Sequence, residues 1–361
     1  MLCLSLHGQS RPDSMLEGAN NGDTAKQVAL GDMYLNGTGT GRDYTAALKW
    51  YSKAAENGNM AAECNIGYLY EQGLGVTRDN FEAMKWYRKS ANKGYARCQC
   101  NLGNMYEHGT GTQQDLAEAL KWYKKSAEGD YDYAILNVGR VYDEGLGVRR
   151  DPVEAIKWFR RSADHNDDLA QGKLGSMYEH GSGVAADTVE AIKWYLKSAK
   201  AGNLISENSL GRIYYHGYSG FPPDYNEAVK WFKKAASAGS ELAMYILGQI
   251  YESGVGDIKK DLHQAVHMYT HAAEKGHANS QYRLGVMFET GSGVIKNDSF
   301  AVKYYTMAAG QGHINAAGRL GIMLYEGRGA KMDKEKGVMY IRKAAESGNE
   351  ESKQYVASHG L

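Results

Sequence analysis

The sequence predicts an all-α protein, an α/α superhelical solenoid of tandem helix–turn–helix repeats, each of about 36 residues. Three observations predict this fold class. A glycine recurs at an almost constant spacing, a tryptophan recurs in register with it, and an aspartate with helix-start signals recurs between them. The chain has 44 Gly but only 4 Pro in 361 residues, and this periodicity accounts for the excess of glycine.

The glycine register defines nine units. Nine glycines, each preceded by an apolar residue, are separated by 36 residues five times and then by 37, 37 and 36. They are Gly31, Gly67, Gly103, Gly139, Gly175, Gly211, Gly248, Gly285 and Gly321. A G-x-G turn follows each of them except in the sixth unit, where the turn is stretched to Gly217–Gly220. A glycine inside a helix costs roughly 1 kcal/mol relative to alanine, so we expect neighbouring helices to approach closely at these nine positions.

The bulky residues follow the same register. The tryptophans of the chain occupy one repeat position, and His267-Met268, Tyr304 and Tyr340 continue it less strictly. They are Trp50, Trp86, Trp122, Trp158, Trp194 and Trp231. Residues that recur once per repeat at a fixed place are typical of a stacked core.

Each unit is predicted to contain two helices, called helix A and helix B below. Helix A carries the register glycine and ends at the G-x-G turn, because glycine enters the left-handed region without strain. Helix B is predicted to start at an aspartate in every unit: Asp43, Asp79, Asp115, Asp151, Asp187, Asp224, Asp261, Asp298 and Asp333. A reciprocal capping box is predicted where a glutamate follows three residues later: Glu82, Glu118, Glu154, Glu190 and Glu227. Helix B ends at a glycine or, in two units, at Asp130 and Asn166, which also tolerate the left-handed region.

These boundaries predict the domain organisation. Residues 1–14 are expected to be a flexible N-terminus, 15–22 a partial helix that caps the array, and 349–361 a C-terminal capping helix. The nine repeats between the caps are 23–58, 59–94, 95–130, 131–166, 167–202, 203–239, 240–276, 277–312 and 313–348.

The composition excludes several classes of partner. The 42 basic and 42 acidic residues cancel, so no long-range field attracts nucleic acid or anionic lipid. No stretch approaches 18 apolar residues, and the first ten residues lack the cationic start of a signal peptide. We therefore expect a monomeric cytoplasmic protein with no direct membrane insertion, or a secreted or lumenal one if a signal has been trimmed.

The repeat motif carries a family resemblance. The pattern A-x-x-x-L-G-x-x-Y, G-x-G, D, A-x-K-W-Y, A-A-x-x-G is met in residues 62–94, with alanine, glycine, aspartate and aromatic residues in register. It resembles the Sel-1-like repeat family, relatives of the tetratricopeptide repeats, over about residues 15 to 361. The resemblance implies helices A lining a concave side, and a role as a protein-binding adaptor in signalling, membrane-protein quality control, cell-wall regulation or host–microbe contact.

A binding stripe is predicted on helix A. Counted from the register glycine at 100° per residue, positions −5, −1, +2 and +3 form the core, while −3, −2, +1 and +4 point away from it. Positions −2 and +1 are variable and mostly polar, and related repeats bind peptides there, so the resemblance suggests a peptide or partner domain on this face. The candidate residues are Asn65, Tyr68, Asn101, Asn104, Asn137, Arg140, Lys173, Ser176, Arg212, Tyr245, Tyr282, Arg283 and Arg319. Alanine at Asn101, Asn104 and Arg140 together is expected to weaken a partner without lowering the melting temperature.

Two alternatives stay open for this stripe. It is either a binding wall or solvated surface with ion ladders between repeats, in which acids at position +4 neutralise the basic residues; these acids are Glu71, Glu107, Asp143, Glu179, Glu252 and Glu289. In the last three units the face turns apolar, and it is either an interface or is covered by neighbouring repeats; it carries Tyr245, Ile246, Tyr282, Val286, Ile322 and Tyr325. The Phe221-Pro222-Pro223 turn is likewise either a partner contact or loop variation.

No enzyme, metal or cofactor signature is found. There is no G-x-S-x-G, P-loop or H-E-x-x-H motif, so we expect no catalytic residues, no metal ligands and no cofactor. His108, His180 and His216 share one repeat position, and because adjacent repeats are about 10 Å apart we expect them to be surface residues, too far from one another to share a metal. The four cysteines are interpreted as reduced thiols, with Cys64 and Cys100 as buried small residues or, secondly, as a redox-sensitive pair. Rival functions are a β-lactam hydrolase, as in some cysteine-rich relatives whose paired cysteines are missing here, and a purely structural spacer.

Overall fold

The computed structural model describes residues 10–218 and 220–361, and their side chains from Met15 onward. In this part of the chain every regular element is an α-helix, which confirms the predicted all-α class. The only strand-like pairings there are two isolated bridges, Tyr218 with Phe221 and Val255 with Ile258, in the turns of units six and seven.

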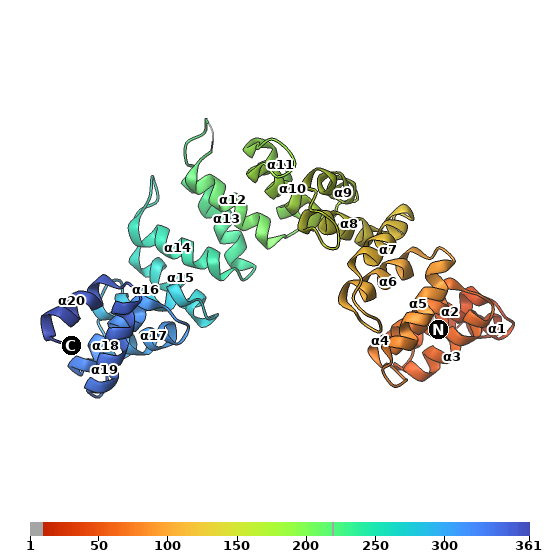
Figure 1. Cartoon of the computed structure of the whole chain (residues 1–361), viewed down its shortest axis with the longest axis horizontal. Coiled ribbons are helices and arrows are strands. Elements are labelled where there is room, and N and C mark those ends of the chain that lie inside the picture. Colours follow the sequence, from red (N-terminus) through yellow and green to blue (C-terminus); the bar gives the residue numbers. More distant parts are fainter. Residues whose placement is uncertain (1–9, 219) are drawn as a thin grey trace, which may run out of the picture. The chain divides into compact units, whose positions relative to one another are not determined.

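The helices divide into two compact units, residues 1–187 and 188–361 (Figure 1). The N-terminal unit carries the A helices α2 (Thr24–Asn36), α4 (Met60–Gln72), α6 (Ala96–His108), α8 (Asp132–Glu144) and α10 (Asp168–His180). Its B helices are α3 (Tyr44–Glu56), α5 (Asn80–Asn92), α7 (Leu116–Glu128) and α9 (Pro152–Asp164), preceded by α1 (Ser10–Asn20). The first helix begins at Ser10, so it extends into the segment 1–14 that was expected to be flexible; residues 1–9 lie outside the described part.

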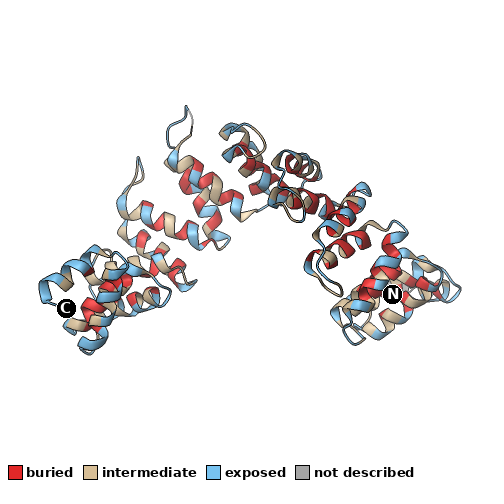
Figure 2. Ribbon diagram, in the orientation of Figure 1, coloured by how far each residue is buried: buried red, intermediate tan, exposed pale blue. Residues whose placement is uncertain are grey.

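The C-terminal unit begins on a B helix. Its B helices are α11 (Thr188–Lys200), α13 (Tyr225–Ser237), α15 (Leu262–Glu274), α17 (Asp298–Gly310) and α19 (Lys334–Glu346). Its A helices are α12 (Leu204–His216), α14 (Glu241–Ser253), α16 (Ala278–Thr290), α18 (Ile314–Glu326) and α20 (Glu350–His359). The last of these is the lone capping helix that the sequence predicted. Within each unit the buried residues line the inner sides of the hairpins, and the exposed residues lie on the outer turns (Figure 2).

The register glycines mark close contacts, as predicted. A Cβ atom placed on Gly31 would lie 2.3 Å from the ring of Tyr51, and one on Gly103 would lie 2.8 Å from the ring of Tyr123. In each case the neighbour is an aromatic ring of helix B in the same hairpin. The flat ring packs directly on the glycine backbone, which explains why the helix tolerates the glycine cost.

The G-x-G turn also makes a close contact with the preceding repeat. The second glycine of the third unit, Gly111, has a φ of 71°, and a Cβ atom there would lie 2.4 Å from the carbonyl oxygen of Asn80 at the start of α5. The turn therefore needs glycine both for its conformation and for stacking.

The predicted caps of helix B are confirmed, except that one cap residue differs and the capping boxes are not reciprocal. Aspartate side chains cap helix B, but the cap of α17 is Asn297, and Asp298 is the first helical residue. Asn297 lies 12 residues after Gly285, as Asp43 lies after Gly31, so the error came from preferring aspartate. The confirmed aspartate caps are Asp43, Asp79, Asp115, Asp151, Asp224, Asp261 and Asp333.

The capping boxes are not reciprocal. The backbone N–H of Asp79 donates to the carbonyl of Tyr70, at 3.0 Å, so it is not available to the Glu82 carboxylate. Glu82 instead accepts from Lys85 at 2.7 Å. The same tyrosine carbonyl bond closes the turn before Asp115 and Asp151. At the other end of helix B, Asp130 and Asn166 have positive φ angles of 59° and 64°, which confirms the predicted left-handed substitutes for glycine.

Candidate binding surface on the A helices

The A-helix face is defined here as the residues two before, one after and four after each register glycine. In the structure this face lies where consecutive A helices meet, so it is less exposed than predicted. Asn65 and Asn137 are only 7% and 6% exposed. The Asn65 amide donates to Asp32 of the preceding repeat at 3.3 Å. The face is therefore partly a contact between repeats.

A tyrosine hydroxyl from helix B anchors this face in five repeats. The hydroxyl donates to an acid, or to an acid and an amide, on helix A. The pairs are Tyr51 with Asp32, Tyr87 with Glu71, Tyr123 with Asn104 and Glu107, Tyr269 with Glu252, and Tyr305 with Glu289, at 2.6–2.7 Å. Burial, and then the neighbouring carboxylate, raise the pKa of each of these tyrosines, so the hydroxyls stay neutral donors.

Three of the predicted arginines pair with these same acids. Arg140 reaches both Glu107 oxygens, at 2.6 and 2.7 Å, Arg283 reaches Glu252 at 2.6 Å, and Arg319 reaches Glu289 at 3.3 Å. Burial alone would lower the pKa of the Arg283 guanidinium, but the hydrogen bond and charge of Glu252 raise it. For these arginines the structure matches the ion-ladder alternative, since each bridges two repeats.

The same contacts change the expected behaviour of the triple variant. Asn104 holds the Tyr123 hydroxyl, and Arg140 holds Glu107, whose pKa is lowered because its bonds to Arg140 and Tyr123 outweigh burial. Removing these partners leaves buried polar groups unpaired. Alanine at Asn101, Asn104 and Arg140 together is therefore expected to lower the melting temperature, and this expectation replaces the earlier one of unchanged stability.

The remaining polar candidates in the middle of the chain are more exposed. Lys173 is exposed and its ammonium group lies 3.7 Å from the carboxylate of Asp143 in the preceding repeat. In that preceding repeat Phe159 replaces the anchoring tyrosine. The Ser176 carbonyl lies 2.8 Å from His180 Nδ1, and Arg212 is exposed.

The apolar candidates of the C-terminal unit are covered by the following repeat. The Tyr282 ring stacks on His313 with centroids 4.6 Å apart, and the Tyr245 ring lies 4.8 Å from His277. These histidines are the N-caps of α18 and α16, and their Nδ1 atoms accept backbone N–H groups at 3.2 Å. Burial lowers the pKa of both histidines. The structure thus matches the second alternative for this face, that neighbouring repeats cover it.

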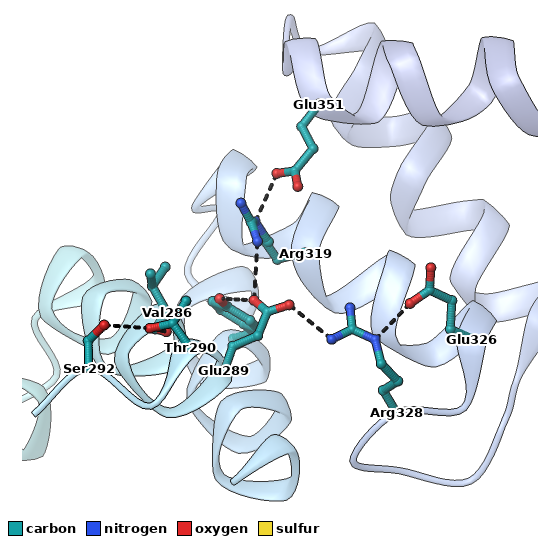
Figure 3. Close-up of polar contacts among 9 residues, drawn as sticks. Val286, Glu289, Thr290, Ser292, Arg319, Glu326, Arg328 and Glu351 are labelled. Atoms are coloured by element: carbon teal, nitrogen blue, oxygen red, sulfur yellow. Dashed lines mark hydrogen bonds and ion pairs between the residues drawn. The ribbon is translucent and has the colours of Figure 1, made fainter. Parts of the chain in front are cut away.

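An ion-pair network closes the end of the same face (Figure 3). Glu289 accepts from Tyr305, Arg319 and Arg328 at 2.7–3.3 Å. Arg319 continues to Glu351 of α20 at 2.8 Å, and Arg328 continues to Glu326 at 2.7 Å. The network joins α16, α18 and the capping helix, so these polar groups act in packing.

The N-terminal unit holds a hollow on its A-helix face. It has a volume of about 360 Å³ and is lined by Tyr68, Glu71, Arg97, Asn101, Asn104, Tyr131 and Tyr133. Three of these, Tyr68, Asn101 and Asn104, were candidates from the sequence. Arg97, Tyr131 and Tyr133 were missed because they lie at the start of helix A, outside the positions considered.

A tyrosine at the N-cap distinguishes the repeats around this hollow. Tyr95 and Tyr131 precede α6 and α8 and make no side-chain cap bond. The other A helices begin at side chains that accept a backbone N–H: Asp23, Asn59, Asp167, Asn203, Ser240, His277, His313 and Asn349. Loss of a cap bond costs about 1 kcal/mol. The tyrosine in this register was the sequence signal that could have located the hollow.

Arg97 gives the hollow a positive charge, beside the carboxylate of Glu71. It is exposed, and no hydrogen bond or ion pair with the described residues holds its guanidinium. Its charge opposes the burial effect on three tyrosines, lowering the pKa of Tyr51, Tyr87 and Tyr131 relative to burial alone. Glu71 in the same hollow accepts from Tyr87. The hollow therefore presents one unpaired guanidinium donor and tyrosine hydroxyls, which can donate or accept.

The cysteines differ from the sequence interpretation. Cys64 of α4 and Cys98 of α6 form a disulfide, with Cα atoms 5.7 Å apart, so these two are not reduced thiols. Their separation of 34 residues is two short of the repeat, which places them opposite each other on consecutive A helices. Cys100 is free and buried, as expected, and burial raises the pKa of its thiol to about 12.

The histidines that share a repeat position are surface residues, as interpreted. His108, His180 and His216 are all exposed. In the described part of the chain no group of three histidine, cysteine or acidic side chains is placed to hold a metal. None of the helices described there is long and apolar enough to cross a bilayer.

Stacked A and B helices, with register glycines of helix A packed against side chains of helix B, define a tandem α-hairpin repeat protein. The Sel1 repeat family model matches nine segments, 27–59, 61–95, 96–131, 132–167, 168–203, 205–240, 242–277, 278–313 and 314–349. The chain belongs to the Sel1 repeat family. Members of this family are generally protein-interaction scaffolds, and the fold is typical of proteins without enzymatic activity.

Two solved structures illustrate the similarity. A Sel1 repeat protein from Oxalobacter formigenes is 36% identical over 69% of this chain and 99% of its own, with a TM-score of 0.59. A protective antigen of uropathogenic Escherichia coli with an SLR fold is 30% identical over 97% of this chain and 83% of its own, with a TM-score of 0.51. A comparison with curated proteins found no match.

Proposed function

We propose that the protein is a non-enzymatic scaffold that binds an extended segment of a partner protein in the hollow of the N-terminal unit. The observation that carries this proposal is the unpaired Arg97 guanidinium in a hollow lined by Tyr68, Tyr131 and Tyr133. Tyrosine and arginine are enriched at the centres of protein interfaces because each combines a large contact area with directional hydrogen bonds.

The donors of the hollow indicate what the segment offers. Guanidinium and hydroxyl groups donate to carboxylate and carbonyl oxygens, and a guanidinium can donate two bonds to one carboxylate. An extended peptide exposes its main-chain carbonyls, and an acidic side chain adds a carboxylate. The helices that begin at Tyr95 and Tyr131 lack a side-chain cap bond. This also supports binding, because functional sites often keep residues that lower the local stability of the fold.

Photo-cross-linking tests the location. Benzoylphenylalanine is placed at position 133 and, in a second variant, at position 205, since Tyr133 and Ile205 hold the same repeat position and are 55% and 72% exposed. We expect partner adducts at 133 that disappear when Arg97→Ala is added, and none at 205. Adducts at both positions, or adducts that survive Arg97→Ala, would contradict the proposal.

The same experiment separates the rival functions. A structural spacer predicts adducts at neither position. A β-lactam hydrolase predicts turnover of a chromogenic lactam by the purified protein. The scaffold proposal predicts no turnover above the uncatalysed rate in buffer.

The cellular location stays a prediction. A cytoplasmic protein was expected, with a secreted or lumenal one as the alternative. The disulfide between Cys64 and Cys98 favours the alternative, because such bonds persist mainly in oxidising compartments.

A further inference from the structure

The seventh B helix departs from the other repeats at a set of linked positions. In the first six repeats, two basic residues flank the tryptophan of helix B, one before it and one three residues after it. In α15 both basic positions are histidine, His267 and His271, and Met268 replaces the tryptophan between them. The basic pairs of the other repeats are Lys49 and Lys53, Lys85 and Lys89, Lys121 and Lys125, Lys157 and Arg161, Lys193 and Lys197, and Lys230 and Lys234.

The usual partners of these basic residues are absent from the seventh repeat. In the first six repeats, the second cation lies over the tryptophan ring, as Lys125 does over Trp122 at 4.2 Å. In the second to sixth repeats, the first basic residue pairs with the glutamate three residues before it, as Lys121 does with Glu118 at 2.7 Å. In α15 no indole ring is available at this position, and Gln264 replaces the glutamate. The two imidazoles face each other instead.

The geometry of the pair matches a metal chelate. His267 and His271 are both exposed, and their Nε2 atoms lie 3.1 Å apart. Metal–nitrogen bonds to zinc are about 2.0–2.1 Å, so two nitrogens at this separation subtend an angle of about 100° at the ion. That angle lies between octahedral and tetrahedral geometry. Residues four apart share one face of a helix, so the backbone needs no change.

A carboxylate is placed to orient one of the ligands. Glu274 lies 3.6 Å from His271 Nδ1, on the side of the ring away from His267. A metal-binding histidine usually donates its second ring N–H to such a group, which fixes the tautomer that leaves Nε2 free for the ion. The pair and its orienting acid all lie within α15, in a single compact unit.

We propose that His267 and His271 form a surface site for a divalent transition-metal ion such as Zn²⁺ or Ni²⁺. The site lies on helix B, apart from the A-helix face, and does not depend on the proposed partner binding. Imidazole nitrogen suits these borderline ions, whereas Mg²⁺ and Ca²⁺ prefer oxygen. Two protein ligands leave coordination positions for water or for a side chain of another molecule. No metal ligands were expected from the sequence, because histidines were compared only between repeats, where the spacing is too wide; the His-x-x-x-His pattern along one helix was not considered.

Titration calorimetry with Zn²⁺ and Ni²⁺ tests the site, on protein freed of metal by a chelator and carrying no affinity tag. We expect one equivalent to bind, with the affinity reduced more than about tenfold in His267→Ala and in His271→Ala, because each removes one of two ligands. His108→Ala is the control, since His108 is exposed on α6, has no other histidine within one helical turn, and should leave the affinity unchanged. Mg²⁺ should not compete.

Three outcomes would overturn the proposal: no binding by the wild-type protein, binding by the His267→Ala and His271→Ala variants equal to that of the wild type, or an equal loss in His108→Ala. Because both ligands are exposed, the variants are expected to keep the helical circular dichroism spectrum and melting temperature of the metal-free protein. A rise in melting temperature on adding Zn²⁺ should occur in the wild type and be absent in the variants.

Discussion

Helix A begins on tyrosine around the hollow of the N-terminal unit and on histidine at the covered face of the C-terminal unit. Tyr131 makes no cap bond, and Arg97, which lines the same hollow, has no ion pair or hydrogen bond with a described residue. His277 and His313 cap their helices and pack their rings on the tyrosines of the preceding repeat. The residue at this repeat position therefore differs between the open part of the A-helix face and the part closed by its own neighbours.

The acids on the two faces differ in the same sense. Glu289 holds two arginines and a tyrosine, whereas Glu71 holds the Tyr87 hydroxyl and has no ion pair with a described residue. Arginine is present on both faces, but on the closed face it bridges repeats. An arginine on a repeat surface thus indicates a binding site only where no acid of the adjacent repeat reaches it.

The largest effect is expected from Glu289→Ala. This change leaves Arg319, Arg328 and the buried Tyr305 hydroxyl without their shared acceptor, and it should destabilise the C-terminal unit by about 3 kcal/mol. Glu71→Ala, the matched change in the N-terminal unit, should cost about 1 kcal/mol, because it removes only the acceptor of the neutral Tyr87 hydroxyl. Urea denaturation and hydrogen exchange of α16 and α18 measure the two losses. Equal losses would remove the distinction between the faces.

Acid should loosen the closed face before the open one. Burial lowers the pKa of His277 and His313 below the usual 6.5, and the charge of Glu241 only partly opposes this for His277. Between the folded and unfolded pKa values the unfolded chain binds more protons, so stability falls as the pH drops below about 6.5. Protonation also removes two cap acceptors worth about 1 kcal/mol each.

The double variant His277→Asn and His313→Asn sharpens this test. Asparagine keeps the cap bond without a titrating ring, so the melting temperature should lose its dependence on pH between 5 and 7, in the range where histidine titrates. An unchanged dependence would show that other groups are responsible.

A smaller effect is expected from Tyr131→Asn, which introduces the cap found at Asn59 and Asn203. The first turn of α8 should gain up to about 1 kcal/mol, measured as slower exchange of the Ala134 amide, because the new side chain accepts a backbone N–H there. Cross-linking at position 133 should weaken at the same time, since the hollow loses a hydroxyl. Faster exchange would mean that the packing of the tyrosine ring outweighs the cap.

The smallest effect on stability is expected from Arg97→Ala. An exposed side chain with no partner contributes little, so the free energy of unfolding should change by less than about 0.5 kcal/mol, while adducts at position 133 are lost. Arg283→Ala is the comparison, because Arg283 is ion-paired and its removal leaves Glu252 without its guanidinium partner. A large loss of stability in Arg97→Ala would show that its guanidinium has a structural role.

The sequence predicts the fold well because the residues that recur once per repeat restrict the backbone sterically. A glycine beneath an aromatic ring, and a left-handed turn at Asp130 or Asn166, depend on single residues whose conformational preferences are strong. Helix ends were harder to predict where two residues compete. Asn297 and Asp298 are adjacent and both can cap, so only the repeat spacing distinguishes them.

The candidate site was less predictable because it depends on contacts between repeats. Whether Arg140 is free or paired depends on Glu107 of the preceding repeat, 33 residues away. The disulfide pairs Cys64 with Cys98 across helices offset by two residues, and comparing equal repeat positions misses it. Arg97 was overlooked because it lies at the start of helix A, outside the positions considered. Only the folded structure places it in the same hollow as Tyr131.

The contact between a register glycine and an aromatic ring of helix B has a consequence for how such chains change length. Gly31 and Tyr51, or Gly103 and Tyr123, belong to one hairpin, so the fit is carried within a single segment of about 36 residues. A duplication or deletion that keeps the glycine and the ring together inserts or removes one complete hairpin. A breakpoint between them would pair the glycine of one repeat with the ring of another. We therefore expect the folded products of genetic exchange between repeats to contain intact hairpins.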